Sequence, residues 1–370
     1  MRDGPISELD DASNGRVISI DPLAEPRWDA FLAQHPEARL AHSSSWLEVV
    51  QRTYGYRPAH LAYESAESIL GVLPLVSVRS PLTGSRLVSL PFSGPAGPIG
   101  RSPSVIDALV GAALKVTSQG RYSYLNIQSM AGQLTPDDGR LTRLNPFVCS
   151  LLPLSDDPVQ VWNGIPFKAL KQEIKQARTR GVTVSVSDDL ADLRAFYELS
   201  VQTSRKHGLP PQPYALFESM WGILKPKQML SLFVATLNDR VIGAQICFQF
   251  KDIFSAGYVG TDYRALKYYH PIKLLDWSAI EWACSNGFRH FDLLQSHVRN
   301  EGLRWYKRSF GAIEVPVTYY YFPKVGSTAV LRDVLVGRRW GVGKLVQPVL
   351  RRLPTTGLKM VGNSIFRHMG

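Results

Sequence analysis

Alternating and helical patterns of apolar residues predict an α/β protein in which one supersecondary unit occurs twice. Residues 61–80 and 233–250 each alternate as two strands around a tight turn, with Gly71 and Gly243 at matching places. A third strand, a helix and a further strand follow each hairpin, and these last strands, 122–129 and 290–296, both end in Gln-Ser. The repeat predicts two similar units of mixed sheet and helix, packed side by side, with Gln128 and Gln295 in equivalent places.

The segment from Phe288 to Gly311 carries the strongest functional signal, because it predicts a buried strand, a polar turn and a short helix. Open α/β sheets usually hold ligands at the carboxyl ends of their strands. The polar side chains at this end are Asp292, Gln295 and Ser296. The basic and aromatic side chains on the helix are Arg304, Tyr306 and Lys307. The alternative interpretation is a sheet edge followed by a solvated basic helix.

A second basic helix is predicted just after the middle of the chain, ending at Gly181. Its basic residues share one face beside an apolar stripe, and they are Lys168, Lys171, Lys175 and Arg178. Such a face is either solvated or able to recognise phosphate. The loop at residues 93–100 is another candidate phosphate site, but Pro95 and Pro98 remove two backbone donors. This loss favours a rigid turn over the sheet.

Composition narrows the function classes. The chain has 370 residues, 45% hydrophobic and 20% charged, with no apolar run long enough for a transmembrane helix and an acidic, polar start unlike a secretory signal. Its three cysteines lie far apart in apolar contexts, which fits a reducing cytoplasm. The histidines show no metal-ligand spacing, so no metal is expected. Phosphate-loop, dinucleotide-binding and hydrolase motifs are also absent from the sequence.

Residues 324–370 differ from the rest of the chain, because they hold nine Lys or Arg against one acid, Asp333. This segment therefore carries +8 of the formal +11 charge, interleaved with aliphatic residues and broken by glycines. Two interpretations are open: a loosely ordered tail, or an interfacial anchor for an anionic membrane surface. The charge also admits nucleic acid, but no RNA- or DNA-binding signature occurs in the sequence.

The order and spacing of several motifs over residues 28–323 resemble tandem GNAT domains in the arrangement of FemAB-like transferases, in the branch found with exopolysaccharide and cell-envelope genes. The motifs are Gly71-Val72-Leu73-Pro74-Leu75, Ser89-Leu90-Pro91-Phe92 with Gly94 and Gly97, Ile174-Lys175-Gln176-Ala177-Arg178, Phe291-Asp292 with Ser296, and Gly302 with Tyr306-Lys307 and Phe310-Gly311. One departure is that Leu294-Gln295-Ser296 stands where the family often has Gly-Arg-Ser. Any anion contact made by that Arg must come from elsewhere.

The resemblance implies an acyltransferase of tandem GNAT architecture that moves an acyl or aminoacyl group to an amino group of a cell-envelope or exopolysaccharide precursor. By the same resemblance, Lys307 is the residue beside the reacting acyl group, and Asp292 orients the acceptor or holds a cation. The alternative for Asp292 is an ion pair at the end of the strand. The expected substrate-binding residues are Lys171, Lys175, Arg178, Arg205, Tyr258, Gln295, Ser296, Arg304 and Tyr306. Acyl-CoA and aminoacyl-tRNA are both compatible donors, bound as co-substrates rather than as resident cofactors.

The expected organisation is a disordered segment at residues 1–15, a first GNAT-like domain at 16–154, a second at 155–323 with the active site, and the basic tail at 324–370. The expected location is the cytoplasm, with contact to the inner face of the membrane if the tail is an anchor. The expected acceptor is a small molecule or a lipid-linked sugar. Two other classes stay open, a non-catalytic binding module of an envelope-assembly complex and a basic nucleic-acid-binding protein.

Overall fold

A computed structural model describes residues 15–81, 84–119, 122–130, 134, 139–323 and 343–369. The elements of the first half are β1 (Arg16–Ser19), α1 (Pro26–Gln34), α2 (Ser44–Tyr54), β2 (Arg57–Pro58), β3 (Leu61–Ser65), β4 (Ser68–Leu73), β5 (Val76–Ser80), β6 (Gly84–Val88), β7 (Ile99–Gly100), α3 (Pro103–Ser118), β8 (Tyr124–Met130) and β9 (Thr142–Pro153).

The elements of the second half are α4 (Pro158–Gly164), α5 (Lys168–Thr179), β10 (Thr183–Ser187), α6 (Leu190–His207), α7 (Tyr214–Leu224), β11 (Leu230–Leu237), β12 (Arg240–Phe250), β13 (Ile253–Thr261), α8 (Tyr263–Tyr269), α9 (Pro271–Ser285), β14 (His290–His297), α10 (Glu301–Arg308) and β15 (Ile313–Phe322). Two C-terminal helices follow, α12 (Gly343–Arg352) and α13 (Thr355–Met369).

Local signals in the sequence account for where several helices begin. The Ser43 hydroxyl accepts a hydrogen bond from the Trp46 amide at 3.2 Å and caps α2. Ser102 caps α3 in the same way, with Pro103 at the first helical position. Pro271 likewise opens α9. These three helices therefore begin where the sequence offers a capping hydroxyl or a proline.

The two halves have the same strand order, as the repeat predicts. The second half runs β10-β11-β12-β13-β14 within one sheet of eleven strands, and the first half runs β1-β3-β4 and then β5-β6-β8. The first half differs by a break, because β4 belongs to a separate four-stranded sheet and β5 to the large one. Pro74 lies at this break and has no N–H to donate to a ladder, whereas β12 is continuous.

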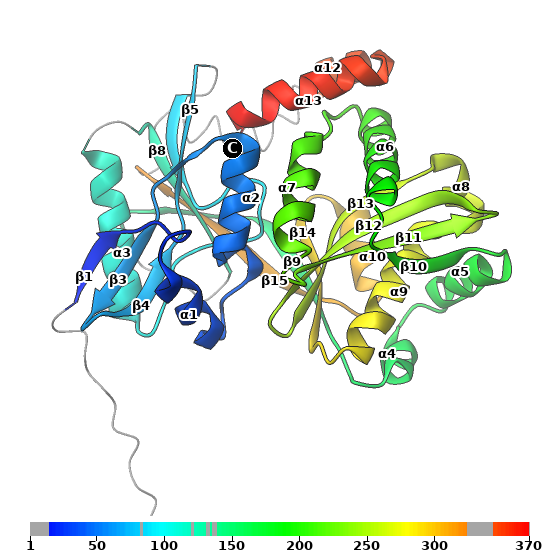
Figure 1. The fold of residues 1–370 in the computed structure, drawn as a ribbon, viewed down its shortest axis with the longest axis horizontal. Helices are drawn as coiled ribbons and strands as arrows, with labels where there is room; N and C mark the ends of the chain where they lie inside the picture. The colour runs from blue at the N-terminus through cyan, green and yellow to red at the C-terminus, as the bar shows by residue number, and fades with distance from the viewer. Residues whose placement is uncertain are drawn as a thin grey trace, which may run out of the picture.

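The halves also exchange strands. β9, from the first half, lies between β14 and β15, and β15, from the second half, lies between β9 and β8. One large sheet therefore runs through the whole molecule, with helices over its faces (Figure 1). The predicted mixed α/β fold of two units with the same strand order is confirmed.

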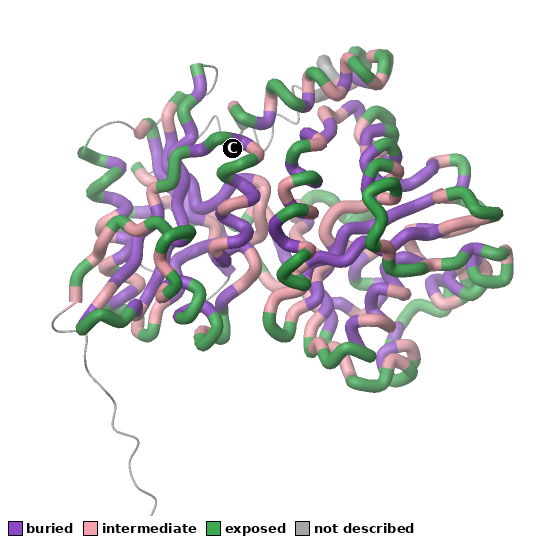
Figure 2. Tube along the Cα trace, viewed as in Figure 1, coloured by how far each residue is buried: buried purple, intermediate pink, exposed green. Residues whose placement is uncertain are grey.

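The apolar core follows this plan, with buried residues along the central strands of both halves (Figure 2). One cluster lies under α3, a second lies between the sheet and helices α5 and α9, and a third crosses the junction between the halves. At that junction α2 packs on α7, and the Trp46 ring meets Phe248 edge-on at 5.2 Å. The junction is therefore a packed core rather than a hinge of exposed polar residues.

The C-terminal helices lie across the junction, from α6 toward β5 (Figure 1). Leu350, Leu358 and Phe366 are buried in the shared core, and the Tyr56 hydroxyl donates to the Phe366 carbonyl at 2.8 Å. A loosely ordered tail is therefore the wrong interpretation for residues 343–369, while residues 324–342 lie outside the described part. Membrane binding by this segment stays a prediction. Among the described residues, no helix combines the length and apolar character needed to span a bilayer.

Candidate active site

The parallel strands β13 and β14 pair over only three positions and then separate. The pairs are Ile253–His290, Phe254–Phe291 and Ser255–Asp292. Beyond them, the register of β13 against β12 shifts near Gly257, and the register of β14 against β9 shifts between Asp292 and Gln295. Both strands continue past the last pair, and cavities on the two sides of the gap share Gly257, Leu294 and Gln295 as lining residues.

A left-handed residue maintains the bend in β14. Leu294 has φ of +60°, a conformation that costs a residue with a Cβ about 1–3 kcal/mol unless its surroundings compensate. Its N–H donates to Asp292 Oδ1 at 2.8 Å, and its carbonyl accepts from Lys307 Nζ at 2.9 Å. The carbonyl of Gln295 accepts from the same ammonium at 3.1 Å. Asp292 and Lys307 therefore hold the gap open from its two sides.

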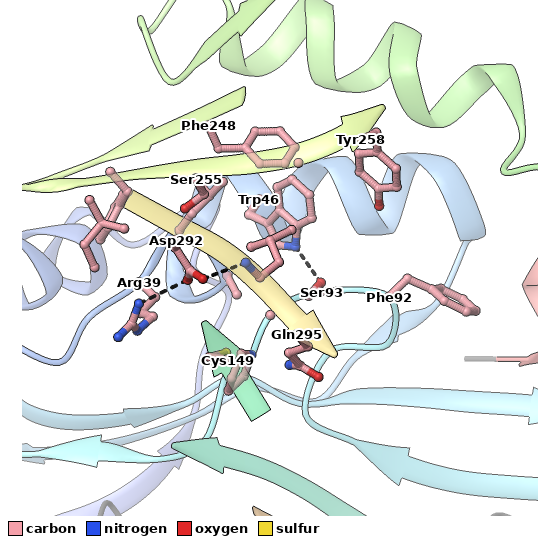
Figure 3. A pocket seen from close by; sticks show the side chains of 18 residues that line it. Arg39, Trp46, Phe92, Ser93, Cys149, Phe248, Ser255, Tyr258, Asp292 and Gln295 are labelled. Carbon is pink, nitrogen blue, oxygen red and sulfur yellow. Dashed lines mark hydrogen bonds and ion pairs between the residues drawn. The ribbon is translucent and has the colours of Figure 1, made fainter. Parts of the chain in front are cut away.

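The first cavity, about 260 Å³, lies between the halves (Figure 3). The first half contributes Arg39 and the segment from Phe92 to Pro95, and the second half contributes β12, β13 and β14. Its aromatic lining consists of Trp46, Phe92, Phe248, Phe250 and Tyr258. The Trp46 ring N–H donates to the Ser93 hydroxyl at 2.6 Å, which ties α2 to this wall. The cavity is therefore mainly apolar.

Arg39 and Asp292, one from each half, meet as an acid–base pair in the first cavity. Arg39 Nη1 lies 3.4 Å from Asp292 Oδ2, and the Asp292 residue is 5% exposed. Burial raises the pKa of the Asp292 carboxyl, while Arg39 and the Leu294 N–H oppose that rise. A carboxylate with a raised pKa inside a cavity is suited to accept a proton.

The second cavity, about 810 Å³, lies on the other side of the gap beside α8 and the start of α9. Its lysines outnumber its carboxylates, and the charged lining residues are Lys206, Lys267, Lys273, Lys307, Glu173 and Asp276. Lys273 pairs with Glu173, and Lys206 Nζ lies 3.4 Å from the centroid of the Tyr263 ring. Lys267 and the beginning of α9 add further positive potential. The cleft therefore favours an anionic ligand.

Lys307 is 5% exposed, and its ammonium group donates hydrogen bonds to the carbonyls of Leu294 and Gln295. Burial lowers the pKa of this ammonium to about 8, against the opposing effect of Asp292. Because Lys307 also lines the second cavity, its positive charge lies beside the gap. It is at once a structural support of the bend and a charge near any group bound there.

Sequence reasoning missed one buried network in the second cavity. The Tyr306 hydroxyl donates to Asp276 Oδ2 at 2.5 Å, and Gln245 Nε2 donates to Oδ1 at 2.8 Å. Burial raises the pKa of the Asp276 carboxyl, and these two hydrogen bonds oppose the rise. The available signal was that Asp276 stands between apolar residues of α9, which is unusual for an acid at a core-facing position.

The structure brings five of the predicted site residues to the gap and places the others elsewhere. Those that line a cavity are Asp292, Tyr258, Gln295, Tyr306 and Lys307. Ser296 is buried next to them without lining either cavity, and its hydroxyl has no hydrogen-bond partner among the described residues.

The basic residues expected to bind substrate lie outside both cavities. Lys171 and Lys175 approach the Trp162 ring, each at 5.9 Å from its centroid, and Arg178 pairs with Glu281. Arg205 donates to the Arg351 carbonyl at 3.2 Å, and Arg304 donates to both carboxylate oxygens of Glu314. These contacts are structural, so a substrate role for the five residues requires a ligand that extends beyond the cavities.

Residues 167–308, the segment that contains the gap, match the family model described as "Acetyltransferase (GNAT) domain". Solved structures extend the likeness to most of the chain. The crystal structure of FemX has a TM-score of 0.67 at 13% identity, over 82% of this chain and 96% of that one.

The structure of L-PGS from Bacillus licheniformis has a TM-score of 0.57 at 14% identity, over 87% of this chain and 98% of that one. A tandem GNAT protein from the clavulanic acid biosynthesis pathway has a TM-score of 0.52 at 11% identity, over 83% of this chain and 98% of that one. The chain thus shares its fold with FemX and with a tandem GNAT protein, as the sequence motifs predict. A comparison with curated proteins gives no match.

Proposed function

We propose that this protein transfers an acyl or aminoacyl group from a phosphate-bearing donor in the second cavity to an amino group in the first. The observation that carries the proposal is the gap between β13 and β14, which gives a basic cleft and an apolar cavity the same three lining residues. Acyl transfer needs an activated donor and a nucleophile to meet at one carbonyl, with water kept out. The GNAT match over residues 167–308 supports this reaction class.

The donor side follows from charge. Lys206 and Lys267 can meet phosphate groups, and the apolar and backbone edges of β13 and β14 can hold an uncharged arm that leads to the gap. Acyl-CoA has this layout and is the usual co-substrate of a GNAT domain, so it is the first donor to test. Aminoacyl-tRNA, which the FemAB-like resemblance implies, is the second.

The proposed chemistry uses Asp292 and Lys307. The acceptor nitrogen attacks the acyl carbonyl carbon, a C–N bond forms, and the carbonyl oxygen takes the negative charge beside the Lys307 ammonium. The Asp292 carboxylate accepts the proton that the nitrogen loses. When the carbonyl reforms, the bond from carbon to the donor's sulfur or oxygen breaks. The proton that Asp292 accepted passes to the leaving group, which departs as a thiol or hydroxyl and restores the carboxylate.

The first cavity, where the acceptor would bind, is mainly apolar around the pair formed by Arg39 and Asp292. The amine must enter the first cavity as the neutral base, and the cavity lined by Trp46, Phe248 and Tyr258 favours an apolar connection between this amine and the rest of the acceptor. An amino group carried by a cell-envelope or exopolysaccharide precursor, including a lipid-linked sugar, is the acceptor class that we propose.

Binding of free CoA and turnover of acetyl-CoA test the proposal. Lys206→Glu and Lys267→Glu should each raise the Kd for CoA about tenfold or more, because a charge-assisted hydrogen bond to phosphate is replaced by repulsion. Lys171→Glu is the matched control, since Lys171 lies on α5 outside both cavities, and its Kd should stay within about twofold at moderate salt.

Release of free thiol from acetyl-CoA in the presence of an amine acceptor then separates an enzyme from a binding module. Binding without thiol release, over a broad panel of amines, would favour the non-catalytic alternative. Equal loss of CoA binding in the Lys171 control would remove the second cavity from the account.

A further inference from the structure

Gln295 lies where the two cavities meet, and its side-chain amide is incompletely satisfied. The residue lines both cavities, and its Nε2 atom is buried with no hydrogen-bond partner among the described residues. A buried N–H group without an acceptor is unfavourable, and in a native protein such a group calls for an explanation, of which a functional contact is one. The last torsion of a glutamine side chain is soft, so the amide can turn toward either cavity.

The backbone around Gln295 is fixed even though its amide is not. Its carbonyl accepts from Lys307 Nζ at 3.1 Å, and it pairs with Cys149 on β9. Figure 3 shows Gln295 on β14 close to Asp292, at the end of the first cavity. A short amide on a rigid backbone can therefore meet a group held in the gap without large rearrangement.

The equivalent glutamine of the first half has a different environment. Gln128 lies on β8, which pairs in parallel with β6 as β14 pairs with β13. Its Nε2 donates to Asn126 Oδ1 at 3.2 Å, and its backbone N–H donates to the Ser89 hydroxyl at 2.7 Å. The side-chain amide of Gln128 thus has an internal hydrogen-bond partner, whereas Nε2 of Gln295 has none among the described residues.

We propose that Gln295 donates a hydrogen bond to the acyl carbonyl oxygen of the donor, the oxygen that becomes negative during transfer. This inference rests on the proposed function and assigns a residue that differs from the Arg often found at this place in FemAB-like proteins. A neutral amide suits the site, because Lys307 already supplies positive charge and a second cation would lower the pKa of Lys307 further.

Other unpaired polar groups near the gap fit this role less well. Ser296, Ser150 and Thr318 each have a buried hydroxyl oxygen without a partner among the described residues, but none of the three lines either cavity. Gln245 lines the second cavity, yet its Nε2 is already donated to Asp276. Gln295 alone among these five residues combines a free N–H with a position at the junction.

The test compares the affinities of the protein for acetyl-CoA and S-ethyl-CoA, a thioether of similar size in which a methylene replaces the carbonyl. Wild type should bind acetyl-CoA about three- to tenfold more tightly, the range expected for one hydrogen bond. In Gln295→Met, which keeps length but has no N–H, the ratio of the two affinities should fall to about one. Because a ratio is measured, a general loss of folded protein does not imitate the effect.

Gln128→Met is the matched control, with the same substitution at the equivalent place in the first half, and it should keep the wild-type ratio. A Gln295→Met protein that still prefers acetyl-CoA as wild type does would overturn the inference while leaving the proposed function intact. If wild type binds neither thioester nor thioether, the acyl-CoA donor is wrong and the carbonyl contact is wrong with it. A changed ratio in both variants would show that the effect is not local to Gln295.

Discussion

The two halves of the molecule share a strand order but differ where their parallel strands end. In the first half, the chain stays against β8 after the pair Val88–Asn126, because the Ser89 N–H donates to the Asn126 carbonyl at 2.9 Å. Gly97 then lies so close to β8 that a Cβ there would meet Ser129 Oγ at 2.6 Å. In the second half, the pairing stops at Ser255–Asp292 and the strands separate.

This difference shows how a duplicated fold can provide a single cleft. The segment from Ser89 to Gly100 covers the end of β8 and removes the space that a donor would need. Part of the same segment, from Phe92 to Pro95, forms a wall of the first cavity. In the proposed function, the first half thus forms a wall of the acceptor site, and the second half holds the donor cleft.

The largest expected effect comes from making the second half resemble the first at one position. Asp292→Asn places the residue type of Asn126 at the equivalent site and removes the proton acceptor. Transfer should slow by about 10²–10⁴-fold, the usual contribution of general base catalysis. Steady-state kinetics should show the loss in kcat, while the Kd for CoA, which binds on the other side of the gap, changes little. A variant with wild-type kcat would exclude Asp292 as the base.

Replacing Lys307 should slow transfer somewhat less and also weaken the fold. Lys307→Met removes the positive charge beside the acyl carbonyl and should lower kcat by about 10²–10³-fold. It also leaves the Leu294 and Gln295 carbonyls without their donor, which costs about 1–3 kcal/mol of unfolding free energy for each unsatisfied group. Lys307→Arg should recover part of both, and equal loss of stability with normal kcat would make Lys307 purely structural.

The pH dependence separates these two roles of Lys307. Its pKa is about 8 in the folded protein and near 10.5 when exposed, so the unfolded chain binds more protons between these values. The free energy of unfolding should therefore increase as pH rises from about 8 to 10.5, so the folded protein becomes more stable. Over the same range kcat should fall, because the ammonium is lost. Lys307→Met should lack both trends. Chemical denaturation and kinetics over this range measure them.

A smaller effect on transfer is expected from disturbing the segment from Ser89 to Gly100, which covers the end of β8 in the first half. Gly97→Ala forces the covering segment away from Ser129 and should cost about 1–3 kcal/mol of unfolding free energy. Because this segment continues from the wall of the first cavity, the KM for the amine should rise while the Kd for CoA stays unchanged. Gly111→Ala in α3, where a Cβ meets nothing within 4 Å, is the control and should stabilise by about 0.4–1 kcal/mol.

The repeated unit could be predicted from the sequence because its signals are local. Alternation in residues 61–80 and 233–250, helix caps such as Ser43 and the polar end of β14 all lie within a few residues of the features they predict. The exchange of β9 and β15 between the halves could not be predicted from the sequence, because pairs such as Val148–Ser296 join distant parts of the chain. Pairing of that kind depends on tertiary contacts rather than on periodicity.

The candidate site shows the same limit. Helical spacing identified the basic face of α5, but only the fold reveals that Arg178 meets Glu281 and that Lys206 and Lys267 line the cleft instead. The interleaved charges of the C-terminal segment gave no sign that Leu358 and Phe366 complete the core shared by the halves. The apolar neighbours of Asp276 on α9 indicate that it is buried, but its partners Gln245 and Tyr306 are distant in the sequence and appear only in the fold.

Hydrogen exchange with and without acetyl-CoA tests the central claim most directly, since it reports on each strand end separately. The account predicts slower exchange in peptides that cover residues 257–261 and 293–297, at the open end of β13 and β14. Peptides that cover residues 89–97 and 126–130, at the closed end of the first half, should show no change. Protection that falls on the first half, or equally on both halves, would contradict the assignment of the donor cleft to the second half.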